Sequence, residues 1–293
     1  MVYRIILVCI VTFMSFGSYA QLPKTDLYLA EFTNLSGAPL LKDVKFLNKF
    51  NPNGYNNQPG FISYDELYIT VGLENAKFTD IYQLNLKTNE YFPFSETESI
   101  SEFSATQSKQ EGKVSCIRIE VDGKDQSLWS YPADRSNTGK RLLPKLTNVG
   151  YHTWLNKDSV VLFLVGSPQT LVLANVENDI VEPITDNIGR CIKYDQNNLL
   201  YYVHKSTPDI WNLMSYNINN KQKSIICKMP KGKEDYDFLI NGKILCGDGS
   251  ILKMFDPSKD IEWANVANFS SYGINNINRL AIVRDRIVFV NSK

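Results

Sequence analysis

A short pattern of alternating apolar and polar residues recurs five times along the chain, each time ending at Asn, Asp or Pro before a polar turn. Alternation with a period of two is typical of a half-buried β-strand. The five segments are Ile81–Asn85, Leu128–Pro132, Leu171–Asn175, Leu213–Asn217 and Leu252–Asp256. Their last residues lie 47, 43, 42 and 39 positions apart. A repeat of about 43 residues that holds several short strands is typical of the blades of a β-propeller.

A second pattern precedes the first in most repeats: a strand, a turn rich in Asn, Asp or Gly, and a more continuously apolar strand. Gly60–Ser63 leads in this way into Leu67–Val71, and Thr153–Leu155 leads into Val160–Val165. Such turns between apolar runs predict β-hairpins. The continuous apolar second strand indicates a sheet that is covered on both faces, as a blade between two neighbouring blades would be.

Each end of the chain carries part of a repeat. The last repeat has only two strands, Asn278–Ile282 and Arg286–Val290, and Asp26–Phe32 with Leu40–Phe46 near the N-terminus could supply the missing pair. We therefore expect an all-β fold, a six-bladed β-propeller whose last blade is closed by N-terminal strands. Closure leaves no exposed sheet edge. The alternative, an open two-sheet sandwich, does not explain the partial repeat at each end.

The first twenty residues have the pattern of a secretory signal peptide. Arg4 precedes an apolar run, Ile5–Phe16, and small residues lead to a predicted cleavage after Ala20. The run is too short to span a bilayer, although an uncleaved N-terminal anchor is the alternative. We expect residues 1–20 to be removed and residues 21–293 to form one propeller domain. This domain would be periplasmic or secreted, with no membrane span.

Composition narrows the function classes. The 293 residues include 31 Lys and Arg against 31 Asp and Glu, so the chain lacks the basic excess of most nucleic-acid-binding proteins. Four cysteines follow the signal peptide: Cys116, Cys191, Cys227 and Cys246. They lie in apolar segments without CxxC spacing, which favours buried free thiols over the disulfides that export would permit. We expect a monomer without cofactors.

Two segments resemble the TolB-like (WD40-like) six-bladed propellers of bacterial envelopes. Gln58–Asp65 is similar to the family's Pro-x-Phe-Ser-Pro-Asp-Gly hairpin, with Ser-Tyr in place of Ser-Pro and Glu66 in place of Gly. Asp80–Thr88 is similar to the family's Ile-Tyr-x-x-Asp-x-x-Thr-Gly strand. The resemblance covers essentially the whole mature chain. It implies an envelope setting and a role in binding or scaffolding, and it carries over no catalytic residues.

Polar residues stand at the start of every strand that we expect to line the central channel. The candidate ligand-binding residues are Gln58, Glu102, Tyr151, His152, Arg190, Asp235 and Arg279. Convergent charges of both signs in a concavity predict a binding site, although ion pairing around a hydrated channel is the alternative. Arg190 and Arg279 could together clamp a carboxylate or phosphate, which would suit a small anionic ligand.

His152 is the candidate general base, with its tautomer set by Glu102, and a packed structural histidine is the alternative. A calcium site of Glu102, Asp235 and Asn275 or Asn276 is disfavoured by the nearby arginines, so we expect no metal. The chain contains no Gly-x-Ser-x-Gly, phosphate-loop or His-Glu-x-x-His motif.

We therefore expect a non-enzymatic binding or scaffold module that presents its channel mouth to an envelope protein or a small ligand. The alternative is a lyase or hydrolase of small ligands, with a channel site of His152, Glu102, Arg190 and Arg279.

Overall fold

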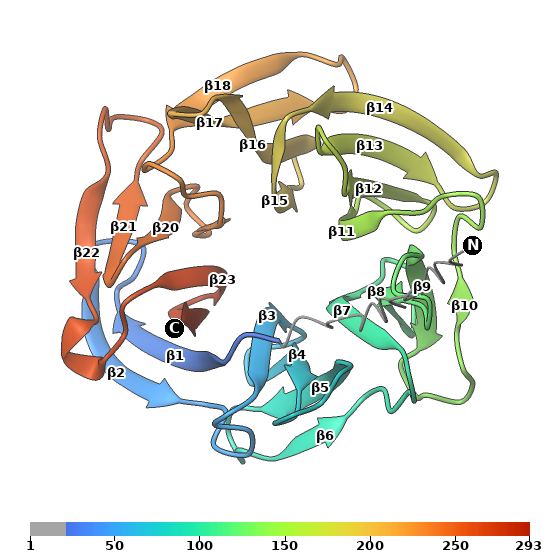
Figure 1. Cartoon of the computed structure of the whole chain (residues 1–293). Helices are drawn as coiled ribbons and strands as arrows, with labels where there is room; N and C mark the ends of the chain where they lie inside the picture. The colour runs from blue at the N-terminus through green and yellow to red at the C-terminus, as the bar shows by residue number, and fades with distance from the viewer. Residues whose placement is uncertain (1–21) are drawn as a thin grey trace, which may run out of the picture.

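The fold is a ring of six antiparallel sheets, each with four strands. It is seen in a computed structural model that describes residues 22–293, so the predicted signal peptide lies outside the described residues. Figure 1 shows the first strands of the blades nearest the centre and the fourth strands on the outer rim. The predicted six-bladed β-propeller is confirmed.

Five blades follow one another along the chain. Blade 1 contains β3 (Tyr55–Phe61), β4 (Glu66–Gly72), β5 (Asp80–Asn85) and β6 (Tyr91–Pro93). Blade 2 contains β7 (Ser101–Gln107), β8 (Lys113–Ile119), β9 (Gln126–Pro132) and β10 (Lys140–Arg141). Blade 3 contains β11 (Val149–Trp154), β12 (Ser159–Leu164), β13 (Thr170–Asn175) and β14 (Ile180–Asp186). Blade 4 contains β15 (Ile188–Tyr194), β16 (Leu199–Thr207), β17 (Ile210–Asn217) and β18 (Lys223–Lys228). Blade 5 contains β19 (Tyr236–Phe238), β20 (Ile244–Asp248), β21 (Ile251–Phe255) and β22 (Ala264–Asn268).

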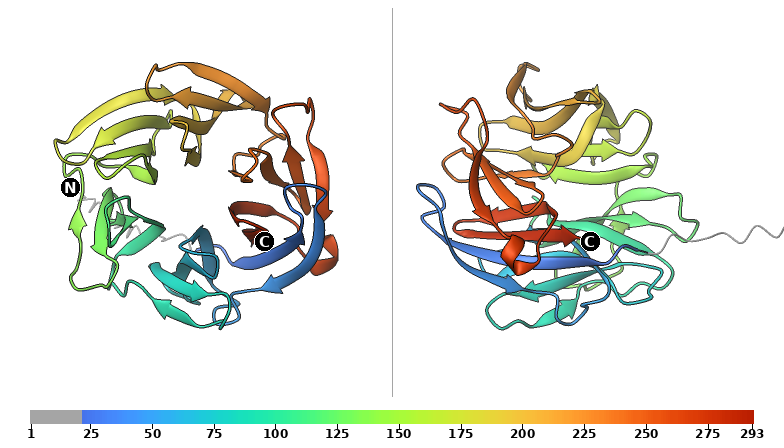
Figure 2. Two further views of the ribbon diagram at one scale, coloured as in Figure 1. Left: turned by 180° about the vertical axis from the view of Figure 1, so that it is seen from behind. Right: turned by 60° about the vertical axis from the view of Figure 1, so that its left-hand side comes forward.

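Blade 6 joins the two ends of the chain. Its strand order is β2 (Leu40–Phe46), β1 (Thr25–Thr33), β24 (Arg286–Ser292) and β23 (Ile277–Val283), and the short helix η1 (Ser270–Tyr272) precedes it. β1 pairs with β24 from Thr25↔Ser292 to Glu31↔Arg286. Figure 2 shows these N-terminal and C-terminal strands side by side. The predicted closure of the last blade by N-terminal strands is therefore confirmed.

The hydrophobic core is divided among the six interfaces between neighbouring blades. Between blades 2 and 3, for example, Ile117 and Leu128 pack in one cluster with Val160 and Leu162. Each second strand is covered on both faces in this way, which explains its continuous apolar sequence. The rigid packing between blades holds the six inner strands around the central channel.

Irregular backbone marks the inner strands. Five of them, β3, β7, β11, β15 and β23, have a register shift against their neighbour, whereas β19 has none. Three successive inner strands, β23, β3 and β7, carry a residue in the left-handed region at the shift: Arg279 (φ 52°), Gln58 (φ 53°) and Ser104 (φ 55°). Such positions cost free energy in residues other than glycine and often lie at functional sites.

Candidate functional site

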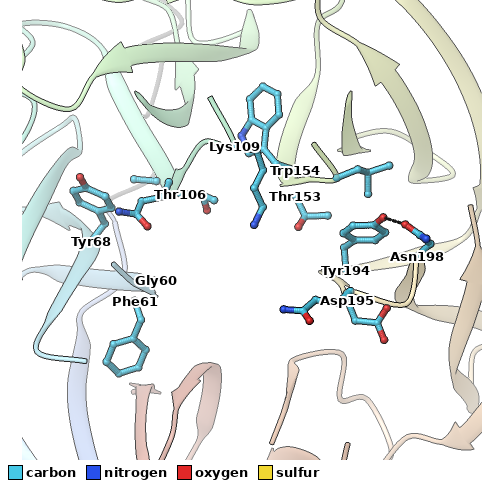
Figure 3. Close-up of a pocket in the computed structure, with 14 residues that line it drawn as sticks. Gly60, Phe61, Tyr68, Thr106, Lys109, Thr153, Trp154, Tyr194, Asp195 and Asn198 are labelled. Carbon is cyan, nitrogen blue, oxygen red and sulfur yellow. Dashed lines mark hydrogen bonds between the residues drawn. The ribbon is translucent and has the colours of Figure 1, made fainter. Parts of the chain in front are cut away.

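Two adjoining cavities occupy the channel. The inner cavity, about 730 Å³, is lined by residues that include Gln58, Ser104, Tyr151, His152, Arg190, Asp235 and Arg279. The mouth cavity, about 760 Å³, is lined by residues that include Phe61, Thr106, Gln107, Thr153, Tyr194 and Gln196. Lys109 lines both cavities. Figure 3 shows the mouth cavity, where the amine of Lys109 points into the open centre. Six of the seven predicted ligand-binding residues therefore line one cavity, and Glu102 does not.

Arg190 is held by carboxylates of the next blade. Its Nε and Nη2 donate to the two carboxylate oxygens of Asp235 at 3.2 and 2.6 Å, and its Nη1 lies 2.9 Å from Oε1 of Glu234. Burial disfavours the charged guanidinium, yet Asp235 and Glu234 together hold the pKa of Arg190 above its ordinary value. A bidentate pair of this kind is fully engaged. Arg190 could therefore clamp a ligand only by giving up its own partners.

The carboxylate of Asp235 is used in the same ion pair. Burial alone would raise the pKa of its carboxyl, but the charges of Arg279 and Arg190 outweigh burial and hold that pKa below its ordinary value. Glu234 is shared in the same way, because its Oε2 lies 2.7 Å from Nζ of Lys205. In this cluster, Arg190 and Lys205 of blade 4 balance the charges of Glu234 and Asp235, which lie at the start of blade 5.

Arg279 crosses the channel. It stands on β23 of blade 6, and its Nη2 donates to the hydroxyl of Tyr151 on β11 of blade 3 at 2.7 Å. Its guanidinium also lies 4.9 Å from the centre of the Tyr151 ring, within the range of a cation–π contact. Within residues 22–293, no carboxylate lies within ion-pair distance of Arg279. The bond therefore joins opposite sides of the ring and leaves the arginine charge without a direct counterion.

His152 is buried against blade 2. The side chain is 8% exposed, its Nε2 lies 2.7 Å from Oγ of Ser115, and Ser115 also accepts a hydrogen bond from Nε1 of Trp154 at 2.8 Å. Burial lowers the pKa of His152 to about 4, so the ring is neutral at pH 7. Its Nδ1 has no hydrogen-bond partner within the described residues. Because Ser115 is 0% exposed, this serine–histidine pair has the distance of a catalytic couple but no access to a substrate.

Glu102 is not at the channel, contrary to the sequence prediction. Its carboxylate is 0% exposed and accepts hydrogen bonds from Thr97 Oγ1 at 2.8 Å, Ser95 Oγ at 3.3 Å and the Tyr131 hydroxyl at 3.4 Å. Burial raises the pKa of Glu102 to about 7. The hydrogen bond expected between Glu102 and His152 is not formed. Glu102 also does not line the inner cavity that holds Asp235, the other carboxylate of the calcium set that the sequence disfavours.

On β7, the residue that lines the inner cavity is Ser104 and not Glu102. Its left-handed backbone stands at the register shift of β7, as Gln58 does in β3 and Arg279 in β23. Gln58 fixes this geometry, because its Oε1 accepts hydrogen bonds from the Ser104 amide at 3.0 Å and from Thr70 Oγ1 at 2.8 Å. Uniform repeat spacing selected a position two residues too early. The bulge that moves the channel residue leaves no clear signal in the sequence.

Three further channel residues were missed by sequence reasoning. Lys109 lies in the loop after β7, where the repeat has no fixed length, and it forms no ion pair within residues 22–293. Lys193 lines the inner cavity and lies 2.9 Å from Oδ2 of Asp237. Cys191 also lines the inner cavity, but burial raises the pKa of its thiol to about 12, so it is not a ready nucleophile. All four cysteines among the described residues are free.

Residues 22–293 contain no group of three or more His, Cys, Asp or Glu side chains arranged to hold a metal ion. In the same part of the chain, no helix is long and apolar enough to cross a membrane.

Comparison with solved structures relates the chain to other propellers. A putative TolB from Agrobacterium tumefaciens superposes with a TM-score of 0.68 at 9% identity, over 92% of this chain and 99% of that one. TolB from Acinetobacter baumannii gives a TM-score of 0.61 at 12% identity, over 89% of this chain and 66% of that one. An oligogalacturonate lyase in complex with manganese gives 0.56 at 11% identity, over 90% and 85%. No family model and no curated protein sequence matches the chain. At these identities the likeness concerns the fold alone.

Proposed function

We propose that this protein is an exported, TolB-like propeller that binds a protein partner at its channel mouth and catalyses no reaction there. The observation that carries the proposal is the state of the channel charges. Arg190 and Lys205 pair with Asp235 and Glu234, and Lys193 pairs with Asp237. Most charged groups of the inner channel are thus paired within the ring, whereas the mouth presents aromatic and amide side chains together with the amine of Lys109.

The lyase or hydrolase alternative requires a base that can reach a substrate. His152 has its Nε2 on buried Ser115, stays neutral at pH 7 and lacks Glu102 as an orienting partner. The thiol of Cys191 is protonated at neutral pH. The resemblance to an oligogalacturonate lyase supplies no residue for this chemistry, because it concerns the fold alone. A binding role therefore fits the channel better than catalysis.

Export is part of the same proposal. It is supported by the signal-peptide pattern of residues 1–20 and by the family resemblance of the repeats. N-terminal sequencing of the protein from its producing cells should begin at Gln21. A chain that keeps Met1 in the soluble cytoplasmic fraction would contradict export.

A site-specific photocross-linker tests the partner. A benzoyl-phenylalanine replaces Gln196, which is exposed at the mouth, and in a control it replaces Asn220, which is exposed in the turn between β17 and β18. Irradiation of producing cells should give a discrete protein adduct from the Gln196 position and none from Asn220. Absence of an adduct at Gln196, or equal adducts at both positions, would contradict a partner at the mouth.

A further inference from the structure

The inner cavity carries a surplus of positive charge. Four cationic side chains line it, against two carboxylates: Lys109, Arg190, Lys193 and Arg279 face Asp235 and Asp237. Glu234 lies next to this cavity but is itself shared between Arg190 and Lys205. Charges of one sign in a concave, partly desolvated site attract ligands of the opposite sign more strongly than the same charges on an open surface.

The surplus rests on two residues, Lys109 and Arg279. Arg190 and Lys193 are paired with Asp235 and Asp237 at 2.6 and 2.9 Å. Within residues 22–293, by contrast, neither Lys109 nor Arg279 has a carboxylate within ion-pair distance. The guanidinium of Arg279 donates to the neutral hydroxyl of Tyr151, a bond that a carboxylate could replace with a charge-assisted one.

The carboxylate at the mouth is already engaged in hydrogen bonds. Asp195 is the one carboxylate among the residues that line the mouth cavity, and it accepts hydrogen bonds from the backbone of Asn197 at 2.9 Å and Leu199 at 3.0 Å and from the Tyr201 hydroxyl at 3.0 Å. It is therefore a turn-forming group. Among the cationic groups that the described residues place along the channel, those left without a counterion are therefore Lys109 and Arg279, and such donors select anionic oxygen ligands.

We infer that the channel binds a ligand bearing carboxylates, which Lys109 receives at the mouth and Arg279 receives deeper in the inner cavity. The inference rests on the proposed function in one respect: the protein partner would supply these carboxylates on an extended acidic segment. Cavities of about 730 and 760 Å³ are large enough for such a segment. A small polycarboxylic acid has the same chemistry and is the other source to be distinguished.

This inference changes the anion site that the sequence suggested. The arginine pair Arg190 and Arg279 was the predicted clamp, but Arg190 is taken up by its bidentate pair with Asp235. Lys109 replaces it as the second anchor. The two anchors lie on blades 2 and 6, with blade 1 between them.

Calorimetric titration of the purified protein at pH 7 and low salt tests the inference with three probes. These are an acetylated tetraglutamate peptide, the matched tetraglutamine peptide and citrate. Each probe is titrated into wild type, Lys109→Gln, Arg279→Gln and the control Lys87→Gln. Lys87 is exposed in the turn after β5 and lines neither cavity, so its variant makes the same change in net charge.

We expect tetraglutamate to bind, tetraglutamine to bind at least about tenfold more weakly, and each channel substitution to weaken tetraglutamate by about tenfold while Lys87→Gln has no effect. Added salt should weaken binding to wild type more than to the channel variants. Lys109 is exposed, so Lys109→Gln keeps the test valid even if Arg279→Gln impairs folding. Arg279→Lys should retain part of the affinity.

The outcomes separate the two proposals. Tetraglutamate and tetraglutamine binding equally well, or tetraglutamate binding unchanged in Lys109→Gln, would overturn the carboxylate site and leave the protein-partner function standing. Citrate bound in a manner that depends on Lys109 and Arg279, without binding of the peptide, would support the carboxylate site and contradict a protein segment as its source. No binding of either acid would overturn the inference.

Discussion

The buried carboxyl of Glu102 should contribute to stability a pH dependence of unusual direction, which its replacement by Gln would remove. The substitution Glu102→Gln removes the ionisable group while keeping its size and its ability to accept hydrogen bonds from Thr97 and Ser95. Burial raises the pKa of Glu102 in the folded state from 4.5 to about 7, with the nearby charge of Asp80 adding to the rise and the Thr97 hydrogen bond opposing it. Unfolding restores the ordinary value, so folding takes up a proton between these two pH values.

The sign and size follow from linkage. A raised folded-state pKa gives stability that is fully present below pH 4.5 and is lost as the pH rises to about 7. The shift corresponds to about 3 kcal/mol of unfolding free energy, since one pKa unit is about 1.4 kcal/mol. Because Glu102 is 0% exposed, solvent screening does not reduce this figure much. Relative to wild type, Glu102→Gln should therefore gain about 3 kcal/mol between pH 4.5 and about pH 8.

His152 opposes this trend in wild type. Burial lowers its pKa from 6.5 to about 4, so its contribution is present above pH 6.5 and is lost as the pH falls to about 4. The two contributions to the pH dependence of the unfolding free energy nearly cancel in wild type. In Glu102→Gln only the contribution of His152 remains, so the stability of this variant should rise with pH. Urea unfolding of both proteins across this range measures the difference, with Glu98→Gln as a control because Glu98 is exposed in the same loop. A Glu102→Gln difference that stays constant with pH would refute the reasoning.

Three further predictions concern closure, the ion pair and the channel thiol. Leu29→Ala, at a 1% exposed position in the closing strand, should cost about 3 kcal/mol in urea unfolding, whereas Leu40→Ala, at a 69% exposed position, should change stability by less than about 0.5 kcal/mol. Asp235→Asn should cost roughly 3 kcal/mol at pH 7 because it leaves Arg190 short of a counterion, and the difference from wild type should shrink at acid pH, since the lowered pKa of Asp235 gives stability that is lost as pH falls. Cys191 should react with a disulfide reagent at least about a hundredfold more slowly in the native protein than in urea, and rapid native labelling would contradict the raised pKa of its thiol.

The sequence predicted the ring better than the channel because the two depend on different signals. The third strands β5, β9, β13 and β17 end at the residues expected from the repeat, and β21 ends one residue early, at Phe255. The alternation of apolar and polar residues in strands and the polar turns between them are local features, and they recur in every repeat. Blade closure followed from counting incomplete repeats. The fold was therefore determined by redundant information.

The channel residues depend on single backbone events. The register shift between Phe103 and Thr106 in β7 moves the channel position from Glu102 to Ser104. No residue type in that segment indicates a register shift. The pairing of Arg190 with Asp235 depends on rotamers across two blades, which repeat spacing does not specify. Sequence reasoning could place charged residues near the channel. It could not tell the charges that build the ring from those that remain free.

The bulged residues and ion pairs of the inner strands are distributed unevenly around the ring, and this distribution affects how a ligand would bind in the channel. On β23, β3 and β7 the inner backbone is bent at left-handed residues, and the Ser104 amide is fixed by Gln58. On the opposite side, Arg190 of β15 is fixed by carboxylates of the next blade, and the Arg279–Tyr151 bond links the two halves. Groups held on rigid strands lose little freedom on binding, so more of their interaction energy appears as affinity. Lys109 differs, because it extends from a loop into the open mouth. We therefore expect Lys109 to govern encounter and salt dependence, and Arg279, whose bond to Tyr151 must be exchanged, to govern the dissociation rate.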